Sequence, residues 1–345
     1  MIQKIHAKVI DIASYLPETT LGNDELAAIY PDWSAEKIYE KTGIKLRHIA
    51  SKEQTATDLA YLAALNLFSR NIVNSGDVDF IILCTQSPDY ILPTSACLLQ
   101  DRLGLSRNCG ALDINLGCSG YVYGLSLAKG LIESGAAKCV LLLTADTYSK
   151  FIHPMDKSVR TLFGDGATAT AIIGIESVGE YIGPFVFGTD GSGGHNLIVE
   201  AGLSRIPYSA VTAIEVVDSS GNIRCNENLY MNGAEIMEFT LKEVPKAVST
   251  LLVKENCQKD DVDYFILHQA NKFMLDALRK KLKISEAKLP IFLEHCGNTV
   301  SSSIPFVLEH MINNGIFKIE KKVMLVGFGV GYSWAGCLLN FKIGE

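Results

Sequence analysis

The sequence predicts an α/β protein assembled from two copies of one half-domain. Three pairs of segments match in the same order: DVDFIILCT at 77–85 with DVDYFILHQ at 261–269, INLGCSG at 114–120 with IFLEHCGN at 291–298, and CVLLLT at 139–144 with KVMLVG at 322–327. Their offsets are nearly equal, at 261 − 77 = 184, 298 − 118 = 180 and 322 − 139 = 183 residues. This period is far too long for a solenoid and indicates an internal duplication. The pairing of INLGCSG with IFLEHCGN places Cys118 opposite Asn298.

Each copy is expected to run strand, helix, strand, helix, strand. In the first copy these elements are FIILC, SACLLQDRLG, CGALDIN, GYVYGLSLAKGLIESG and KCVLLLTAD, and in the second they are YFILH, NKFMLDALRKKL, LPIFLE, a helix over 300–314 and KVMLVGFG. Nearly continuous apolar strands that alternate with amphipathic helices predict a buried, mostly parallel sheet in each copy. We expect an N-terminal half over 1–178, a glycine-rich connector over 179–230 and a C-terminal half over 231–345.

Composition excludes several classes of protein. The 345 residues carry a net charge of −7, which is unlike the basic surface of a nucleic-acid-binding protein. The N-terminus alternates charged and apolar residues like a first strand, and no apolar run is long enough to span a bilayer. The nine cysteines are odd in number and none are spaced C-x-x-C, so we expect reduced thiols in a cytoplasmic protein with no structural zinc.

Four polar or glycine-rich segments follow apolar strands, where ligands collect in sheets of this kind. Cys118 lies between a strand and a helix, and a thiol at a helix N-terminus is expected to have a pKa below the free value of about 8.5. His268 follows YFIL, Asn298 follows PIFLE, and GFGVG at 327–331 follows VMLV. A nucleophilic thiol, two side chains that can donate to an oxyanion and a free backbone N–H together suit acyl transfer.

Each of these signals also has an ordinary structural interpretation. A histidine at a strand end is more often a structural residue, and Asn in GNT is most often a turn or N-cap residue. GFGVG leads into a strand rather than a helix, which argues against dinucleotide binding. FGDGATATAI at 163–172 lacks the Lys-Ser/Thr of a phosphate loop, so we expect it to turn into a strand. It is the four signals together, in this order, that indicate a site.

That combination resembles the β-ketoacyl-acyl-carrier-protein synthase III family of the thiolase superfamily. The shared motifs span nearly the whole chain: SYLPE at 14–18, TGIKLRHIA at 42–50, DINLGCSGYVYGL at 113–125, FGDGA at 163–167, HQAN at 268–271, GNTVSSSIP at 297–305 and GFGVGYSWAG at 327–336. The resemblance implies a thiolase-like, five-layered α/β/α/β/α fold and a homodimer with Cys97 near the interface. It also implies acyl-CoA and malonyl-acyl carrier protein as substrates, with no metal or redox cofactor.

The resemblance implies a catalytic triad of Cys118, His268 and Asn298. The oxyanion hole would be formed by the backbone N–H groups of Cys118 and Val330, and Val330 replaces a family glycine. Substrate-contacting positions would be Leu92, Lys37, Lys157, Phe328 and Lys272.

Several of these positions depart from the family. Lys37 stands where the family has an adenine-stacking Trp, and Lys157 stands where it has a CoA-binding Arg. Leu92 lies where the family places a residue that reaches the partner's acyl pocket. Two of the family's basic carrier-docking positions fall on Glu238 and Phe273. A basic cluster remains at Arg279, Lys280 and Lys281, which is either a docking patch for an acidic carrier protein or a solvated helix face.

The sequence leaves three functions open. The first is decarboxylative condensation of an acyl-Cys118 with malonyl-carrier protein. The second is transfer of the same acyl group to a hydroxyl or amine of a specialised metabolite or sugar. The third is a non-catalytic partner with the same fold, which the presence of all three triad residue types disfavours. The acyl chain length, the pathway and the choice of CoA or carrier protein as donor stay open.

Overall fold

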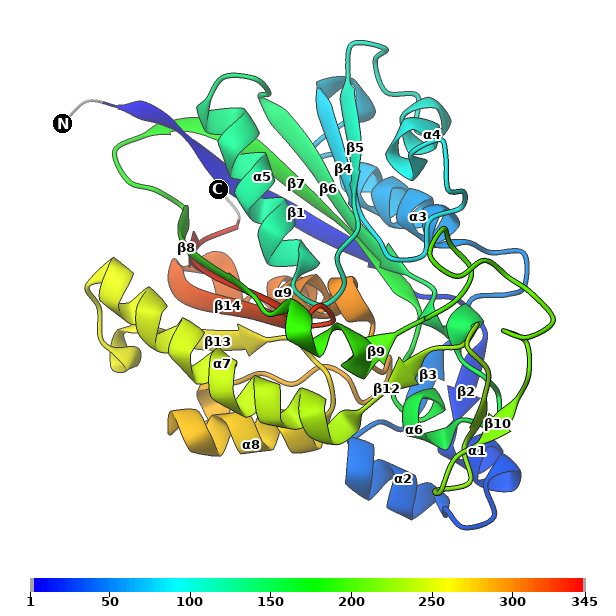
Figure 1. Cartoon of the computed structure of the whole chain (residues 1–345). Helices are drawn as coiled ribbons and strands as arrows, with labels where there is room; N and C mark the ends of the chain where they lie inside the picture. Colours follow the sequence, from blue (N-terminus) through cyan, green and yellow to red (C-terminus); the bar gives the residue numbers. More distant parts are fainter. Residues whose placement is uncertain (1–2, 344–345) are drawn as a thin grey trace.

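The computed structural model describes residues 3–343, in which two mixed sheets lie one behind the other (Figure 1). The first sheet has the order β1-β7-β6-β4-β5 and the second has the order β13-β14-β15-β8. Their strands are β1 (Lys4–Tyr15), β4 (Phe80–Cys84), β5 (Gly110–Ile114), β6 (Cys139–Asp146), β7 (Gly166–Ser177), β8 (Ile182–Thr189), β13 (Tyr264–Leu267), β14 (Lys321–Gly329) and β15 (Ser333–Phe341). All eight residues of β6 are buried, as expected for a strand covered on both faces.

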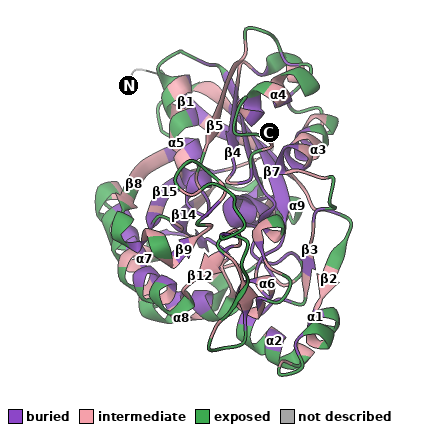
Figure 2. Cartoon of the chain, turned by 45° about the vertical axis from the view of Figure 1, so that its right-hand side comes forward, coloured by how far each residue is buried: buried purple, intermediate pink, exposed green. Residues whose placement is uncertain are grey.

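Six helices complete a five-layered α/β/α/β/α arrangement, as predicted. Helices α3 (Ala56–Ser69) and α4 (Ser95–Arg102) cover the outer face of the first sheet, α5 (Gly120–Glu133) and α9 (Ser303–Asn313) lie between the sheets, and α7 (Gly233–Glu255) and α8 (Lys272–Leu282) cover the second sheet. The central position of α5 follows from its contacts with strands of both sheets. Burial is concentrated in these sheets and in the facing sides of the helices (Figure 2).

The two sheets repeat one topology. In each sheet a parallel pair, β4–β6 or β13–β14, is followed by an antiparallel strand, β7 or β15, and then by β1 or β8. The prediction of mostly parallel pairing was therefore wrong, because β7 and β15 run against their neighbours. The segment 163–172 does lead into strand β7, as expected. The half-domain boundaries stay a prediction, and β8, inside the expected connector, is a strand of the second sheet.

The expected strand LPIFLE at 289–294 is not a strand in the structure. Its backbone groups bond elsewhere: the Phe292 N–H donates to Oε1 of Gln269, and the Glu294 carbonyl accepts from the N–H groups of Lys45 and Leu46. The segment is therefore fixed by a buried side chain and by an N-terminal loop. An apolar run in the sequence does not show whether its backbone groups will pair with a neighbouring strand or, as here, with other partners.

Smaller elements lie outside the two sheets and the six helices that cover them. They are β2 (Thr20–Gly22), α1 (Asn23–Ile29), α2 (Ala35–Thr42), β3 (Leu46–His48), α6 (Lys157–Arg160), β9 (Leu197–Ile198), β10 (Val216–Val217), β11 (Ile223–Arg224) and β12 (Tyr230–Met231), together with seven short 3₁₀ helices among the described residues. All nine cysteines are free thiols. Within residues 3–343 no helix combines the length and apolarity needed to cross a membrane.

Candidate active site

Cys118 lies in the short turn between β5 and α5, two residues before the helix begins at Gly120. The turn is tightly packed, because a Cβ at Gly120 would lie 2.2 Å from Sγ of Cys84 on β4. Only 5% of Cys118 is exposed. The predicted junction of strand and helix is therefore present, with the thiol facing inward.

His268 follows the last residue of β13 and is held by its backbone and its ring. Its N–H donates to the Val326 carbonyl on β14 at 2.9 Å, and Nδ1 lies 2.7 Å from Oγ of Ser303. Because Ser303 Oγ also accepts from the Gln269 N–H at 3.4 Å, the Ser303 O–H is available to donate to Nδ1. When the Ser303 hydroxyl donates to Nδ1, the proton of the neutral ring lies on Nε2, from which it can be donated.

Asn298 is fixed on both sides of its backbone by the segment 162–164. Its N–H donates to the Leu162 carbonyl at 2.9 Å, and its own carbonyl accepts from the Gly164 N–H at 3.0 Å. The side-chain Oδ1 accepts from the Val300 N–H at 3.0 Å. With Oδ1 engaged, Nδ2 is the end of the amide that can donate to a ligand.

One cavity of about 70 Å³ brings the three predicted triad residues together. Its lining residues come from both halves of the chain: Cys118, Leu162, Phe163, Leu197, Met231, Gly233, Ile236, His268, Ala270, Asn271, Met274, Asn298, Phe328 and Gly329. Phe328, predicted as a substrate contact, is among them, and its ring meets the His268 ring edge-on at 5.5 Å between centroids. The convergence expected from pseudo-symmetry is therefore present.

The end of β14 packs directly on the turn that carries Cys118. A Cβ at Gly327 would lie 2.5 Å from the Cys118 carbonyl oxygen, and one at Gly329 would lie 2.9 Å from Sγ. Larger residues at these positions would displace the thiol. The side chain of Val330 packs against Gly117, since a Cβ there would approach Val330 Cγ1 to 2.9 Å.

Burial governs the protonation of both the thiol and the imidazole. Burial, followed by the nearby Asp146 carboxyl, raises the pKa of the Cys118 thiol, whereas the backbone N–H groups of Cys118 and Val330 lower it. The expectation of a thiol pKa below the free value was therefore wrong, because the turn is closed to water. The same two N–H groups therefore lie beside the sulfur, where a carbonyl attacked by the thiol would be placed. Burial lowers the pKa of His268 to about 3, so the ring is neutral at physiological pH.

The other predicted substrate contacts lie outside this cavity. Leu92 is 79% exposed. Lys37 donates to the Asp32 carbonyl at 2.9 Å and lies over the ring of Trp33, while Lys272 pairs with Asp276 at 2.6 Å. The structure does not bring these side chains to the cavity.

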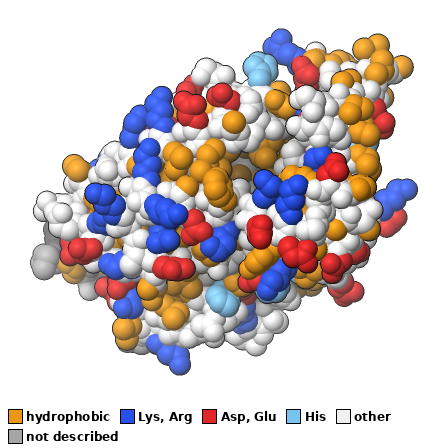
Figure 3. Space-filling view, turned by 90° about the horizontal axis from the view of Figure 1, so that it is seen from below, with side chains coloured by type: hydrophobic (Ala, Val, Ile, Leu, Met, Phe, Trp, Pro, Cys, Tyr) orange, Lys and Arg blue, Asp and Glu red, His pale blue; other side chains and the backbone are white. Residues whose placement is uncertain are grey.

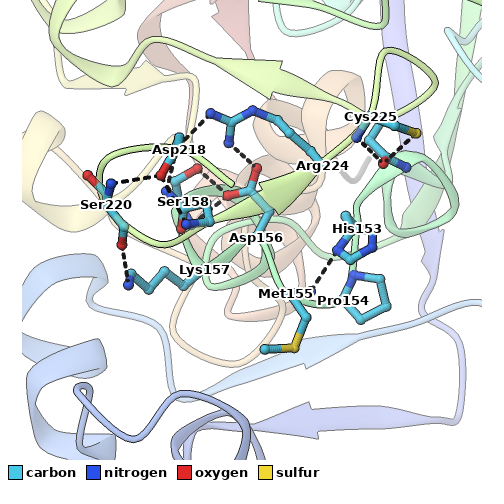
Figure 4. A network of polar contacts seen from close by, with 12 residues as sticks. His153, Pro154, Met155, Asp156, Lys157, Ser158, Asp218, Ser220, Arg224 and Cys225 are labelled. Carbon is cyan, nitrogen blue, oxygen red and sulfur yellow. Dashed lines mark hydrogen bonds and ion pairs between the residues drawn. The ribbon is translucent and has the colours of Figure 1, made fainter. Parts of the chain in front are cut away.

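Lys157 belongs to a polar network that fastens a long surface loop to α6 (Figure 4). Its Nζ donates to the Ser220 carbonyl at 2.7 Å. Beside it, Arg224 bonds the carboxyls of Asp156 and Asp218, each at 2.7 Å. Lys157 is thus engaged with the loop rather than directed into the cavity.

The predicted carrier-docking residues lie on α8, which begins at the cavity wall. Lys280 and Lys281 are exposed, whereas Arg279 is half-buried and lies 3.7 Å from the Asp276 carboxylate. Figure 3 shows the face of the molecule that includes α8, with hydrophobic side chains gathered near its centre and Lys and Arg side chains around them. Phe273, in the first turn of α8, is 65% exposed.

Two residues that form hydrogen bonds with the residues around this cavity were not predicted from the sequence. Ser303 fixes the His268 ring, and Asp146 receives hydrogen bonds from the turn that follows Asn298. The run of three serines in GNTVSSSIP was the available signal for Ser303, and the strand end KCVLLLTAD was the one for Asp146. Within residues 3–343 no group of three or more His, Cys, Asp or Glu side chains could hold a metal ion.

Comparison with known proteins assigns the family. The model of the 3-oxoacyl-[acyl-carrier-protein (ACP)] synthase III family matches residues 112–191, and the model of its C-terminal region matches residues 252–341. A β-ketoacyl-[acyl-carrier-protein] synthase III of Lactococcus lactis subsp. lactis is 38% identical over 97% of this chain and 99% of its own length.

Solved structures give the same assignment. A crystal structure of a 3-oxoacyl-(acyl-carrier-protein) synthase III superposes with a TM-score of 0.96, at 64% identity over 97% of this chain and 100% of that one. A 3-oxoacyl-(acyl-carrier protein) synthase from Burkholderia xenovorans LB400 gives a TM-score of 0.89, at 37% identity over 99% of this chain and 95% of that one. The chain therefore belongs to the 3-oxoacyl-[acyl-carrier-protein] synthase III family of thiolase-fold condensing acyltransferases.

Proposed function

We propose that this chain carries out both half-reactions of a priming condensing enzyme through Cys118, His268 and Asn298. The observation that supports this most strongly is that the three side chains line one cavity built from both halves of the chain. In the first half-reaction the Cys118 sulfur attacks the carbonyl of an acyl-CoA. The acyl–Cys118 thioester forms as the acyl–CoA bond breaks, and the thiol proton leaves with CoA as its free thiol.

The oxyanion of the first step would be held by the N–H groups of Cys118 and Val330. Both already act on the sulfur, which supports this role. Because the thiol is buried and protonated, proton loss belongs to the acylation step itself rather than to the resting enzyme. We therefore expect slow reaction with small alkylating reagents at neutral pH compared with an exposed low-pKa thiol.

The second half-reaction uses malonyl-acyl carrier protein as the nucleophile. Loss of CO₂ leaves an enolate, whose oxygen would accept from Nε2–H of His268 and Nδ2–H of Asn298. The carbanion then attacks the acyl–Cys118 carbonyl, and the cysteine sulfur departs to give a β-ketoacyl-carrier product. The neutral imidazole and the engaged Oδ1 of Asn298 support these donor assignments.

The homodimer and the CoA contacts are part of this proposal. β5 is an edge strand of the first sheet, and the nearby Tyr90, Ile91 and Leu92 are 61%, 84% and 79% exposed, which suits a subunit interface that Leu92 would cross. Lys37, Lys157 and Lys272 would contact CoA from the surface, outside the cavity. A cytoplasmic location and the absence of any cofactor beyond the substrates stay predictions.

Intact-protein mass spectrometry with a panel of acyl-CoAs tests the nucleophile. The wild type is expected to gain the mass of one acyl group and Cys118→Ala to gain none. Cys84→Ala is the matched control, because it removes a buried thiol that packs on the same helix start. An adduct that persists in Cys118→Ala rejects the assignment.

Release of CO₂ tests the second half-reaction. His268→Ala and Asn298→Ala should still be acylated, but should lose CO₂ release from malonyl-carrier protein. Acyl transfer to a hydroxyl or amine without CO₂ release would replace condensation as the assigned reaction.

A further inference from the structure

A buried carboxyl lies behind the active-site cavity at the end of β6. Asp146 is 1% exposed, and its partners are uncharged donors. Its Oδ1 accepts from the Gln86 N–H at 2.8 Å, and its Oδ2 accepts from the N–H and O–H of Ser301 at 3.3 and 2.5 Å. A carboxyl buried without a cation is costly to ionise, so such a group calls for an explanation.

The first partner leads to the Asn298 side of the site. Ser301 follows Val300, whose N–H donates to Oδ1 of Asn298. Val300 has a positive φ of 53°, which is unfavourable for a β-branched residue and needs support from its surroundings. The bonds from Asp146 to Ser301 supply such support immediately after that turn.

The second partner leads to the Cys118 side. Oε1 of Gln86 accepts from the Tyr148 hydroxyl at 2.5 Å and lies against Gly117, where a Cβ would approach it to 2.6 Å. Gly117 directly precedes Cys118. The Asp146 carboxyl therefore bonds both Gln86, which packs behind Cys118, and Ser301, which follows the turn at Asn298.

We propose that Asp146 is a positioning residue of this site: it ties the turn that carries Asn298 to the wall behind Cys118, and its charge acts on the Cys118 thiol. This inference rests on the proposed roles of Cys118 and Asn298. The two predicted halves of the molecule are joined here through a side chain that touches neither the substrate nor the reacting atoms.

The electrostatic part of the proposal has a definite sign. Burial raises the pKa of Asp146 to about 7, while its hydrogen bonds from Ser301 and Gln86 act in the opposite direction. The titratable groups that face it are Cys84 on β4, Cys118, Tyr148 after β6, and Asp165 just before β7. The ionised carboxyl raises the thiol pKa, so ionisation of Asp146 above neutral pH disfavours the Cys118 thiolate.

The test is the pH profile of Cys118 alkylation by iodoacetamide in the full chain, read by mass spectrometry of the peptide that contains Cys118, because eight other free thiols are present. Asp146→Asn should react at the wild-type rate near pH 6, where the wild-type carboxyl is protonated. The ratio of variant to wild-type rate should rise above pH 7, reaching about tenfold for a one-unit change in thiol pKa. A ratio that stays constant from pH 6 to 9 would overturn the proposal.

Asp165→Asn is the matched control. Asp165 is equally buried and accepts from Ser149 and from the Ala50 N–H, but it bonds neither Gln86 nor Ser301. Its variant should keep the wild-type alkylation rate above pH 8, where Asp146 is ionised in both proteins. The pH at which ionisation of Asp146 begins to slow alkylation should be lower in this variant, because the Asp165 charge raises the pKa of Asp146. A rise in rate above pH 8 as large as that of Asp146→Asn would show that any buried carboxyl produces the effect, and would count against Asp146.

Ser301→Ala provides a second test if Asp146→Asn does not fold. Loss of the Ser301 hydroxyl removes a hydrogen bond that lowers the Asp146 pKa. The pH at which ionisation of Asp146 begins to slow alkylation should therefore be higher in Ser301→Ala than in the wild type. CO₂ release should fall because the Asn298 turn is loosened. If Cys118 is alkylated but its profile is unchanged, only this inference fails. If Cys118→Ala is acylated by acyl-CoA like the wild type, the proposed function itself fails.

Discussion

Oγ of Ser303 lies 2.7 Å from Nδ1 of His268, so the first residue of α9 hydrogen-bonds and orients the imidazole at the end of β13. Ser303→Ala should therefore reduce the condensation step roughly tenfold, the effect of one net hydrogen bond, and should leave acylation of Cys118 intact. Steady-state kinetics should show a fall in kcat with little change in KM. Ser303→Thr keeps the hydroxyl and should restore most of the rate, whereas equal losses in both variants would indicate a packing effect.

Buried neutral His268 makes the stability of the fold depend on pH. Its pKa is about 3 in the folded chain and about 6.5 in the unfolded chain, so the unfolded state binds the extra proton between these values. The contribution is present above pH 6.5 and is lost as the pH falls toward 3. Between pH 6.5 and 5 the wild type should lose about 2 kcal/mol more of its unfolding free energy than His268→Gln.

Urea unfolding at the two pH values measures this difference. Asp146 contributes with the opposite sign, because its pKa is raised on folding and its contribution is lost as the pH rises from about 4 to 7. That term is common to both proteins and cancels in the comparison. Parallel losses in the wild type and in His268→Gln would mean that the imidazole is protonated in the folded chain.

The basic end of α8 is expected to set the affinity for the carrier protein. Lys280→Glu combined with Lys281→Glu should raise KM for malonyl-acyl carrier protein severalfold, because complementary charge mainly increases the rate at which two proteins associate. Acylation by acyl-CoA should be unchanged. Lys4→Glu combined with Lys318→Glu is the matched control, because these exposed lysines lie on other elements, at the start of β1 and in the 3₁₀ helix before β14. If the α8 double variant has an unchanged KM for the carrier substrate, its lysines form only a solvated helix face.

The layered fold and the main site residues could be predicted because they depend on local patterns. Uninterrupted apolar runs such as β6 are long and end at polar residues, and the duplication shows which of those ends correspond. The segment 289–294 has the same apolar character, yet its backbone bonds Gln269 and the loop at 45–46. Which partner a backbone group finds is a tertiary property, and the sequence does not contain it locally.

The electrostatics of the site were less predictable for the same reason. The position of Cys118 before a helix suggested a low thiol pKa, but burial of the turn by Gly327, Gly329 and the start of α5 has the larger effect. The position of Asp146 at a strand end is only a weak signal, because carboxyls are common there and its partners Gln86 and Ser301 lie 60 and 155 residues away in the sequence.

Arg224 is expected to hold the surface loop at 199–229 against α6. It is shared between Asp156, which is fully buried, and Asp218, and Lys157 bonds the same loop at Ser220 (Figure 4). Arg224→Met should leave the Asp156 carboxyl buried and unpaired, at a cost of about 3 kcal/mol, and this should release the loop before the rest of the fold. Limited proteolysis should then cut within 199–229 much faster than in the wild type. Arg205→Met, an exposed arginine of the same loop, should be cut at the wild-type rate, and equal cleavage of the two variants would show that the ion pairs do not hold the loop.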